Sequence, residues 1–292
     1  MGRIENDRLE VEIAEIGDYR GSRFDWTGFI TQVRLKDGGH TFCVPESRIA
    51  GQGTGGSGLS NEFGLFKAIG YEDAAVGEGF PKLGIGILTR TDEEDYNFFK
   101  AYPIEPFEVD IKQDVDRIRY RVLPKDCRGY AAELEKTISL QDQVLTIDYR
   151  LTNTGAKPIE THEYIHNFIG IDDYPIGPDY TLRLPKDALG LEPASEYTNS
   201  LLRVNGSQIS WNDDSVREFY FKLPNMTDAG YPWYWEVKHV PSGVGVRESG
   251  SFAPLLMAVW GKGHVVSPEA FIDIRVKPGD SLDWTRKYEF FK

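Results

Sequence analysis

The chain alternates apolar and polar residues with a period of two along much of its length. In residues 144–155 (VLTIDYRLTNTG) every second residue from Leu145 to Leu151 is apolar and the residues between them are mostly polar. Side chains on an extended strand point alternately to its two faces, so this pattern predicts a half-buried strand. Asn153-Thr154-Gly155 supplies the turn that ends it.

The same period predicts further strands. Residues 117–123 (RIRYRVL) alternate in the same way, and so does the C-terminal segment FIDIRVKPGDSLDWTRKYEF. In that segment Pro278-Gly279-Asp280 separates two alternating runs, so we expect the chain to end as a hairpin. Other strand patterns are LEVEIAEI, FITQVRL, TLRLP, EFYFKL, YWEVKH and LLMAVW.

Composition supports an all-β fold. The chain has 16 Phe, 15 Tyr and 6 Trp, together with 30 Gly and 16 Pro, which leaves little room for long helices. We find no long linker, no internal repeat and no heptad run. The sequence therefore predicts one domain over residues 1–292, built from two packed antiparallel sheets with few short helices.

The charge balance narrows the class of partner. The formal net charge is −13, so most of the surface would repel a polyanion, and we do not expect nucleic acid to bind. The N-terminal residues MGRIENDRLEVEI lack an apolar core, and no stretch approaches the roughly 20 apolar residues that span a bilayer. We expect a cytoplasmic protein without membrane association, in which Cys43 and Cys127 are buried free thiols.

The segment HEYIH, His162 to His166, matches the His-Glu-x-x-His pattern of zinc proteases. That pattern holds a metal only on a helix, where both histidines share a face. Here the surrounding residues are rich in Thr, Ile, Tyr and Phe and are bounded by Pro158 and Gly170, which is typical of a strand. On a strand Glu163 points away from the histidines, so we do not expect a metal site.

The same strand favours another kind of site. His162, Tyr164 and His166 share one face, followed on that face by Phe168, with Asn167 beside them. Aromatic rings can stack on sugar faces while imidazoles hydrogen-bond to hydroxyls, so this face is a candidate floor for a polar cleft. The alternative is a pair of histidines on an ordinary solvated sheet face.

No cofactor is predicted. The glycine-rich stretch AGQGTGGSGLSNEFG, Ala50 to Gly64, has no P-loop lysine behind it and opens no helix pattern, so we interpret it as a flexible loop. There is no Gly-x-Gly-x-x-Gly motif in a βαβ context either.

The chain resembles the galactose mutarotase-like (aldose 1-epimerase-like) superfamily. The segments that carry this resemblance are RFDWTGFITQVRLKDG (Arg23 to Gly38), similar to an opening strand pair, then VLTIDYRLTNTG, THEYIHNF and VVSPEAFIDIRVKPGDSL. The resemblance implies a large antiparallel β-supersandwich and a site for a small carbohydrate.

The resemblance also implies catalytic residues. In that superfamily a strand histidine acts as the general acid, and a glutamate near the C-terminus, before a Pro-Gly turn, acts as the general base. The matching positions are His162 and Glu269, and a Tyr-x-His-Asn-Phe pattern equally supports His166. His162 and His166 share a face, so the sequence does not choose between them.

Substrate contacts follow from the same resemblance. Arg48 matches the arginine of an Asn-Arg-Ile segment, although Ser47 replaces the asparagine. Asn61 and Glu62 stand where classical members carry a further histidine. With these two, the candidate substrate-binding residues are Arg48, Asn61, Tyr164, Asn167 and Trp260.

The implied activity is that of an aldose 1-epimerase-type isomerase, which interconverts the α and β anomers of a hexose or related sugar. Two alternatives remain: a carbohydrate-binding or sensing protein without turnover, and a hexose-phosphate epimerase that uses basic residues such as Arg48, Arg90 and Lys100. We expect a monomer or a homodimer that needs no metal.

Overall fold

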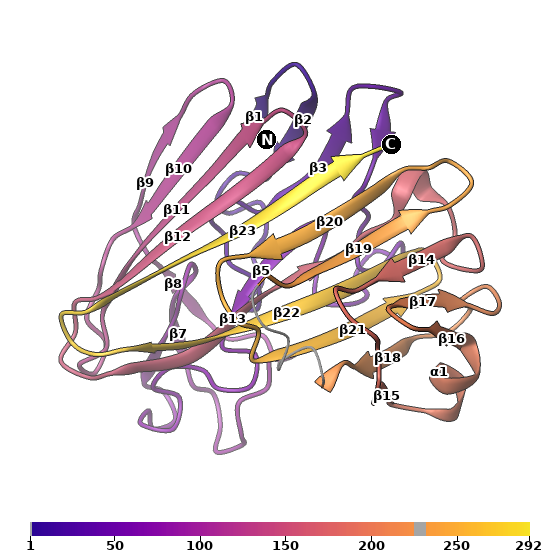
Figure 1. The fold of residues 1–292 in the computed structure, drawn as a ribbon. Coiled ribbons are helices and arrows are strands. Elements are labelled where there is room, and N and C mark those ends of the chain that lie inside the picture. Colours follow the sequence, from indigo (N-terminus) through magenta and orange to yellow (C-terminus); the bar gives the residue numbers. More distant parts are fainter. Residues whose placement is uncertain (1, 225–231) are drawn as a thin grey trace.

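Two ten-stranded antiparallel sheets are stacked in the computed structural model, which describes residues 2–224 and 232–292 (Figure 1). In order across the first sheet, its strands are β1 (Gly2–Glu5), β2 (Leu9–Ile13), β3 (Ile30–Leu35), β5 (Leu59–Phe63), β13 (Ile159–Asn167), β22 (Val265–Val276), β21 (Leu256–Lys262), β18 (Phe219–Lys222) and β15 (Glu192–Pro193), with β4 (His40–Thr41) paired to β3. Strands β5, β13 and β22 lie next to one another at the centre of this sheet.

The second sheet faces the first. Across it the strands are β16 (Leu202–Asn205), β17 (Gln208–Trp211), β14 (Tyr180–Arg183), β19 (Tyr234–His239), β20 (Gly245–Gly250), β23 (Ser281–Phe291), β12 (Val144–Asn153), β11 (Ala132–Gln141), β10 (Arg117–Val122) and β9 (Val109–Gln113). Its apolar face packs on the first sheet, and residues from both sheets form one continuous hydrophobic cluster.

Smaller elements complete the sandwich. A three-stranded sheet contains β6 (Gly79–Lys82), β7 (Gly86–Thr89) and β8 (Ile104–Pro106). A short 3₁₀ helix, η1 (Ile171–Asp173), follows β13, and the only α-helix within the described residues is α1 (Glu196–Leu201), capped by the hydroxyl of Ser195. The all-β fold predicted from the sequence is confirmed.

Polar groups are buried between the two sheets. Arg286 of β23 is fully buried; it bonds Glu163 of β13 at 2.7 Å and Glu248 of β20 at 2.6 Å. Lys136 of β11 is likewise buried and bonds Asp25 at 2.5 Å and the side chain of Asn61 at 3.0 Å. Buried charges require such partners, and these pairs join the first sheet and its loops to the second.

Most of the predicted strands are present, but the prediction of a C-terminal hairpin is wrong. β22 and β23 are consecutive and flank the predicted Pro278-Gly279-Asp280 turn, yet they belong to different sheets: β22 pairs with β13 and β21, and β23 with β12 and β20. A turn pattern in the sequence indicates where the chain reverses its direction. It does not indicate whether the next strand pairs with the previous one. Here the chain crosses from one sheet to the other.

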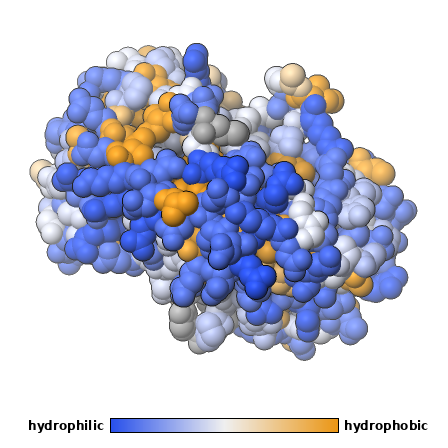
Figure 2. All heavy atoms as spheres, turned by 90° about the horizontal axis from the view of Figure 1, so that it is seen from above, coloured by the Kyte–Doolittle hydropathy of each residue, from blue (hydrophilic) through white to orange (hydrophobic). Residues whose placement is uncertain are grey.

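The outer surface is largely polar. Figure 2 shows a mostly hydrophilic face with apolar residues in separate patches, in keeping with the net charge of −13. Both cysteines are free and buried, as the sequence predicted. In the described part of the chain, no helix combines the length and apolar character needed to cross a membrane.

Candidate active site

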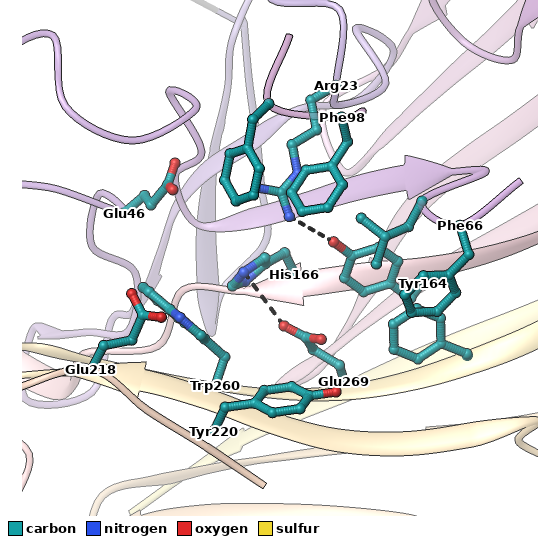
Figure 3. A pocket seen from close by; sticks show the side chains of 13 residues that line it. Arg23, Glu46, Phe66, Phe98, Tyr164, His166, Glu218, Tyr220, Trp260 and Glu269 are labelled. Atoms are coloured by element: carbon teal, nitrogen blue, oxygen red, sulfur yellow. Dashed lines mark hydrogen bonds and ion pairs between the residues drawn. The ribbon is translucent and has the colours of Figure 1, made fainter. Parts of the chain in front are cut away.

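A cavity of about 430 Å³ lies over the outer face of the first sheet, on the side away from the second sheet (Figure 3). Tyr164 and His166 of β13 and Glu269 of β22 form its floor, and Trp260 of β21 stands beside them. The remaining lining residues come from β18, β22 and the loops around them: Arg23, Glu46, Leu65, Phe66, Phe98, Phe99, Glu218, Tyr220 and Phe271.

Strand alternation decides which residues of HEYIH reach this cavity. Tyr164 and His166 line it, whereas Glu163, between them, points into the inter-sheet core and bonds Arg286. The predicted separation of Glu163 from the histidines is therefore confirmed. A zinc-protease arrangement is excluded, because its glutamate would have to share their side of the chain.

His166 and Glu269 are in contact at the floor of the cavity. Nε2 of His166 lies 3.4 Å from Oε1 of Glu269. Ser267, also on β22, completes the cluster: its Oγ lies 2.8 Å from Nδ1 of His166 and 3.2 Å from Oε1 of Glu269. Side chains two residues apart on a strand share a face, which is why Ser267 and Glu269 meet the same imidazole.

Burial shifts the protonation of this pair. Loss of solvent raises the pKa of the Glu269 carboxyl to about 8, against smaller opposing effects of Arg23 and the Ser267 hydrogen bond. Burial also lowers the pKa of His166 well below its usual value, and the positive charge of Arg23 adds to this. For both groups, burial therefore favours the uncharged form over the charged one.

A buried ionic network supports one wall of the cavity. Glu62 of β5 lies opposite Tyr164 in the sheet register and accepts hydrogen bonds from Arg23 Nε at 2.9 Å and from the Tyr164 hydroxyl at 2.7 Å. Arg23 also donates to the Tyr164 oxygen at 3.0 Å. Behind them Lys82 bonds Glu62 at 3.5 Å and Tyr96 at 2.8 Å. The network fixes the Arg23 guanidinium and the Tyr164 hydroxyl beside the cavity.

The walls are aromatic. The imidazole of His166 stacks on Phe168 with ring centroids 4.0 Å apart, and Trp260 meets its edge at 5.2 Å. Tyr164 stacks on Phe271 at 4.3 Å, and Phe66 is two-thirds exposed at the cavity. Flat apolar surfaces next to a few polar groups are typical of small-molecule sites, and they suit the apolar face of a pyranose.

Among the predicted catalytic residues, the structure brings Glu269 and His166 together and leaves His162 apart. His162 does not line the cavity. Its Nε2 accepts a hydrogen bond from the backbone N–H of Phe66 at 3.1 Å, and its ring packs against Phe66 and Phe271. Burial lowers its pKa to about 4, so it is a neutral structural acceptor beneath the cavity wall.

Two residues that were predicted to contact the sugar point to the inner face of their strands instead. Asn61 lies on the inner face of β5, where it donates to Glu163 and accepts from Lys136. Asn167 lies on the inner face of β13, where it donates to the carbonyl of Pro268 at 2.6 Å and accepts from Tyr288. Both side chains are occupied in the inter-sheet core and do not line the cavity. The other two strand predictions, Tyr164 and Trp260, do line it.

The basic residues considered for a phosphate site do not meet at the cavity either. Arg48, predicted to contact the substrate, is exposed and pairs with Asp173 away from the cavity lining. Arg90 donates to backbone carbonyls, including that of Ala74 at 3.0 Å, and Lys100 pairs with Asp92. None of the three lines the cavity.

Arg23 and Ser267 were missed by the sequence reasoning. Arg23 precedes the first long strand and looks like an ordinary surface arginine in RFDW; only the fold places it over β5 and β13. For Ser267 a signal existed, because it lies two residues before Glu269 in an alternating segment and must share its face.

Comparisons with known proteins agree with the architecture. No protein-family model and no curated protein sequence matches the chain. A galactose mutarotase-related enzyme from Lactobacillus acidophilus superimposes with a TM-score of 0.63 at 13% identity, over 100% of this chain and 97% of that one. A galactose mutarotase-like protein from Lactobacillus casei gives 0.60 at 13% identity over 100% of both chains.

A third solved structure extends the likeness to an animal protein. An aldose epimerase homologue from C. elegans has a TM-score of 0.55 at 12% identity, over 99% of this chain and 98% of that one. At such identities the likeness concerns the fold, and it runs over the whole chain. The chain therefore has the galactose mutarotase-like fold, as the resemblance in its sequence implied.

Proposed function

We propose that the protein is an aldose 1-epimerase-type isomerase that interconverts the α and β anomers of a free hexose or related sugar. The observation that carries the proposal is the contact between His166 and Glu269, one proton donor and one acceptor 3.4 Å apart, on the floor of an aromatic-walled cavity. The fold shared with mutarotase-like proteins supports it.

The two groups match the chemistry of anomer exchange. Ring opening removes a proton from the anomeric hydroxyl O1 and delivers one to the ring oxygen O5. The electrons of the O1–H bond form the C1 carbonyl, and the C1–O5 pair stays on O5 with the new proton. Rotation about the C1–C2 bond and closure on the other carbonyl face give the other anomer, while both protons return to their original groups.

The spacing of the pair also suits the substrate. O1 and O5 are bonded to the same carbon, so a donor and an acceptor that contact each other can serve both oxygens from one side of the sugar. The aromatic residues around them supply surfaces for the apolar face of the ring. Tyr164 and Arg23 lie beside the pair and are placed to hydrogen-bond to further hydroxyls.

The charges around the cavity favour a free sugar over a sugar phosphate. The lining holds one arginine, Arg23, and its charge is already paired with Glu62. Against it stand the carboxylates of Glu46 and Glu218. A dianionic phosphate would meet repulsion here, because phosphate sites are built from several converging Arg or Lys groups.

The test is anomer exchange measured by NMR saturation transfer across a panel of aldoses and their 6-phosphates. Wild type should accelerate exchange of at least one free aldose above buffer, and Glu269→Gln should reduce that acceleration on the order of 100-fold or more while leaving sugar binding nearly intact. Glu160→Gln changes an exposed carboxylate on the same sheet and should have no effect.

Two results would contradict the proposal. Sugar binding without any acceleration by wild type would make the protein a carbohydrate-binding protein on this fold. Acceleration that is restricted to the 6-phosphates would shift the substrate class to hexose phosphates.

A further inference from the structure

A smaller cavity of about 180 Å³ adjoins the candidate active site. The two cavities share three lining residues, Arg23, Phe98 and Phe99. The rest of the adjoining cavity is lined by the loops that precede β3 and β5 and by the segment between β7 and β8: Tyr19, Gly21, Ser22, Gly53, Thr54, Lys100 and Ala101. A ligand in the active site can therefore extend past the shared residues into the adjoining cavity.

Two of the shared residues form an aromatic pair at the surface. The ring centroids of Phe98 and Phe99 lie 4.1 Å apart, and Phe99 is 70% exposed. A single exposed apolar side chain needs no explanation, but neighbouring exposed rings at the mouth of a cavity are typical of a binding surface. The flat faces of such rings suit the apolar face of a sugar.

The third shared residue, Arg23, has hydrogen-bond donors to spare. Its guanidinium carbon lies 4.4 Å from the ring centroid of Phe98. A guanidinium has five N–H groups. The three nitrogens of Arg23 bond Glu62, Thr54 and Tyr164 through one N–H each. Two N–H groups are thus left without an acceptor among the described residues, on a side chain that is only 7% exposed. Because buried donors without acceptors are costly, a ligand oxygen between the two cavities would stabilise this arrangement.

The catalytic pair fixes how a sugar must point. His166 and Glu269 act on O1 and O5, so C1 of a bound pyranose lies at this pair. Figure 3 shows Arg23 and Phe98 on the side of the cavity away from Glu269. C4 is the ring carbon opposite C1, so the edge of the sugar that carries O3 and O4 faces Arg23 and the adjoining cavity.

We propose that the adjoining cavity binds a second sugar ring, attached through O3 or O4 of the ring at the catalytic pair, and that the substrate is a reducing disaccharide or the reducing end of an oligosaccharide. Phe98 and Phe99 contact the apolar face of the second ring, and the spare N–H groups of Arg23 donate to oxygens near the linkage. The adjoining cavity is a property of the fold, whereas the placement of the reducing ring at His166 and Glu269 rests on the proposed function.

The lining favours a sugar over an alkyl or aryl substituent. Beside the two phenylalanines, the adjoining cavity is lined by the charged groups of Arg23 and Lys100 and by Thr54. An apolar substituent would displace water from these charges without replacing its hydrogen bonds. A second sugar ring has an apolar face for the aromatic rings and hydroxyl groups for the charged side chains.

The test compares each aldose that the protein exchanges with disaccharides that carry the same aldose at the reducing end. For glucose these are the 4-linked maltose, cellobiose and lactose and the 6-linked isomaltose and melibiose. In NMR saturation transfer at varied sugar concentration, at least one 4-linked disaccharide should reach half-saturation at about 10-fold lower concentration than the free aldose. Equal half-saturation for all of them, a preference for the free aldose, or a gain confined to 6-linked sugars would overturn the proposal.

Variants of the lining test the cause through the ratio of the two half-saturation concentrations. Phe99→Ala removes an exposed ring and should bring the ratio towards about 1, and Ala101→Trp fills the adjoining cavity and should reverse the preference. Phe66→Ala is the matched control, because Phe66 is also exposed and lines the active site but not the adjoining cavity. It should affect both sugars alike and leave the ratio unchanged. An unchanged ratio in folded Phe99→Ala and Ala101→Trp would overturn the second-ring site.

The two proposals fail separately. If exchange is accelerated but no disaccharide is preferred, the isomerase stands and the second-ring site is wrong. If no sugar exchanges faster than in buffer, calorimetric titration of the same sugars decides. A disaccharide that binds wild type more tightly than its aldose, but does not do so in Phe99→Ala, would support the second-ring site without the isomerase. Equal binding of both sugars would overturn the second-ring site as well.

Discussion

Oε2 of Glu62 lies 2.9 Å from Nε of Arg23, and both side chains are buried at the edge of the cavity. The same carboxylate oxygen accepts the hydroxyl of Tyr164. Glu62 does not itself line the cavity, yet it fixes two groups that do. A buried carboxylate in this position makes the cavity wall dependent on an ion pair within the sheet.

Removal of Glu62 should therefore destabilise the protein and loosen the site. Glu62→Ala leaves Arg23 and Lys82 buried without their carboxylate, and loss of one partner of a buried pair costs about 3–5 kcal/mol. Chemical denaturation measures this cost. Asp173→Ala, which breaks the exposed pair with Arg48, is the control and should cost less than about 1 kcal/mol. Equal effects of the two variants would contradict the structural role of Glu62.

The pH dependence of exchange should show a limb at high pH. The groups that face Glu269 are Arg23, Glu62, Tyr220, Ser267 and His166. If Glu269 donates the proton, the rate should fall as the pH rises through about 8, the raised pKa of this group; if it accepts the proton, the rate should rise over the same range. A rate that stays constant to pH 10 would exclude Glu269 as the donor.

The raised pKa of Glu269 should also make the free energy of unfolding depend on pH. The pKa of Glu269 is raised from 4.5 to about 8 in the folded state, so its contribution to folding is fully present below about 4.5 and is lost as the pH rises through about 8. Relative to Glu269→Gln, wild type should thus lose unfolding free energy between these values. Denaturant titrations of both proteins across the pH range measure the difference, and parallel curves would contradict a raised pKa.

Much of the fold was predictable because its signal is local. The two-residue alternation in 144–153 marks a strand whichever neighbours it has, and each such run became a strand of the sandwich. Pairing is not local. The turn at Pro278-Gly279-Asp280 was recognised, but whether β23 returns beside β22 or joins β12 depends on packing between sheets, which a single strand pattern does not encode.

In the site, too, some residues could be placed from the local sequence pattern and others could not. Alternation alone placed His166 and Tyr164 on one face and Glu163 on the other. Applied to Asn167, the same rule shows that it shares the face of Glu163, so its assignment to the site was an avoidable error. Arg23 could not be placed, because its contact with β5 and β13 depends on a loop from a distant part of the chain.

The two histidines of HEYIH should separate in function. His166→Gln removes the group that contacts Glu269 and should lower exchange on the order of 100-fold, whereas His162→Gln should leave exchange within a few-fold of wild type. The cost of His162→Gln should appear in stability, at about 1–3 kcal/mol, if its amide fails to accept the N–H of Phe66. A large loss of exchange in folded His162→Gln would restore His162 as a catalytic residue.

Trp260 should act on sugar binding more than on the chemical step. Its indole lines the cavity and meets the edge of the His166 ring, so its contribution is apolar surface for a bound sugar ring. Trp260→Ala should weaken sugar binding about 10-fold, equal to about 1.4 kcal/mol, with a smaller change in the maximal rate. Trp260→Phe keeps an aromatic face and should recover most of the affinity. Saturation curves of anomer exchange separate the two effects: a lower maximal rate at unchanged half-saturation in Trp260→Ala would mean that the indole orients His166 and does not hold the sugar.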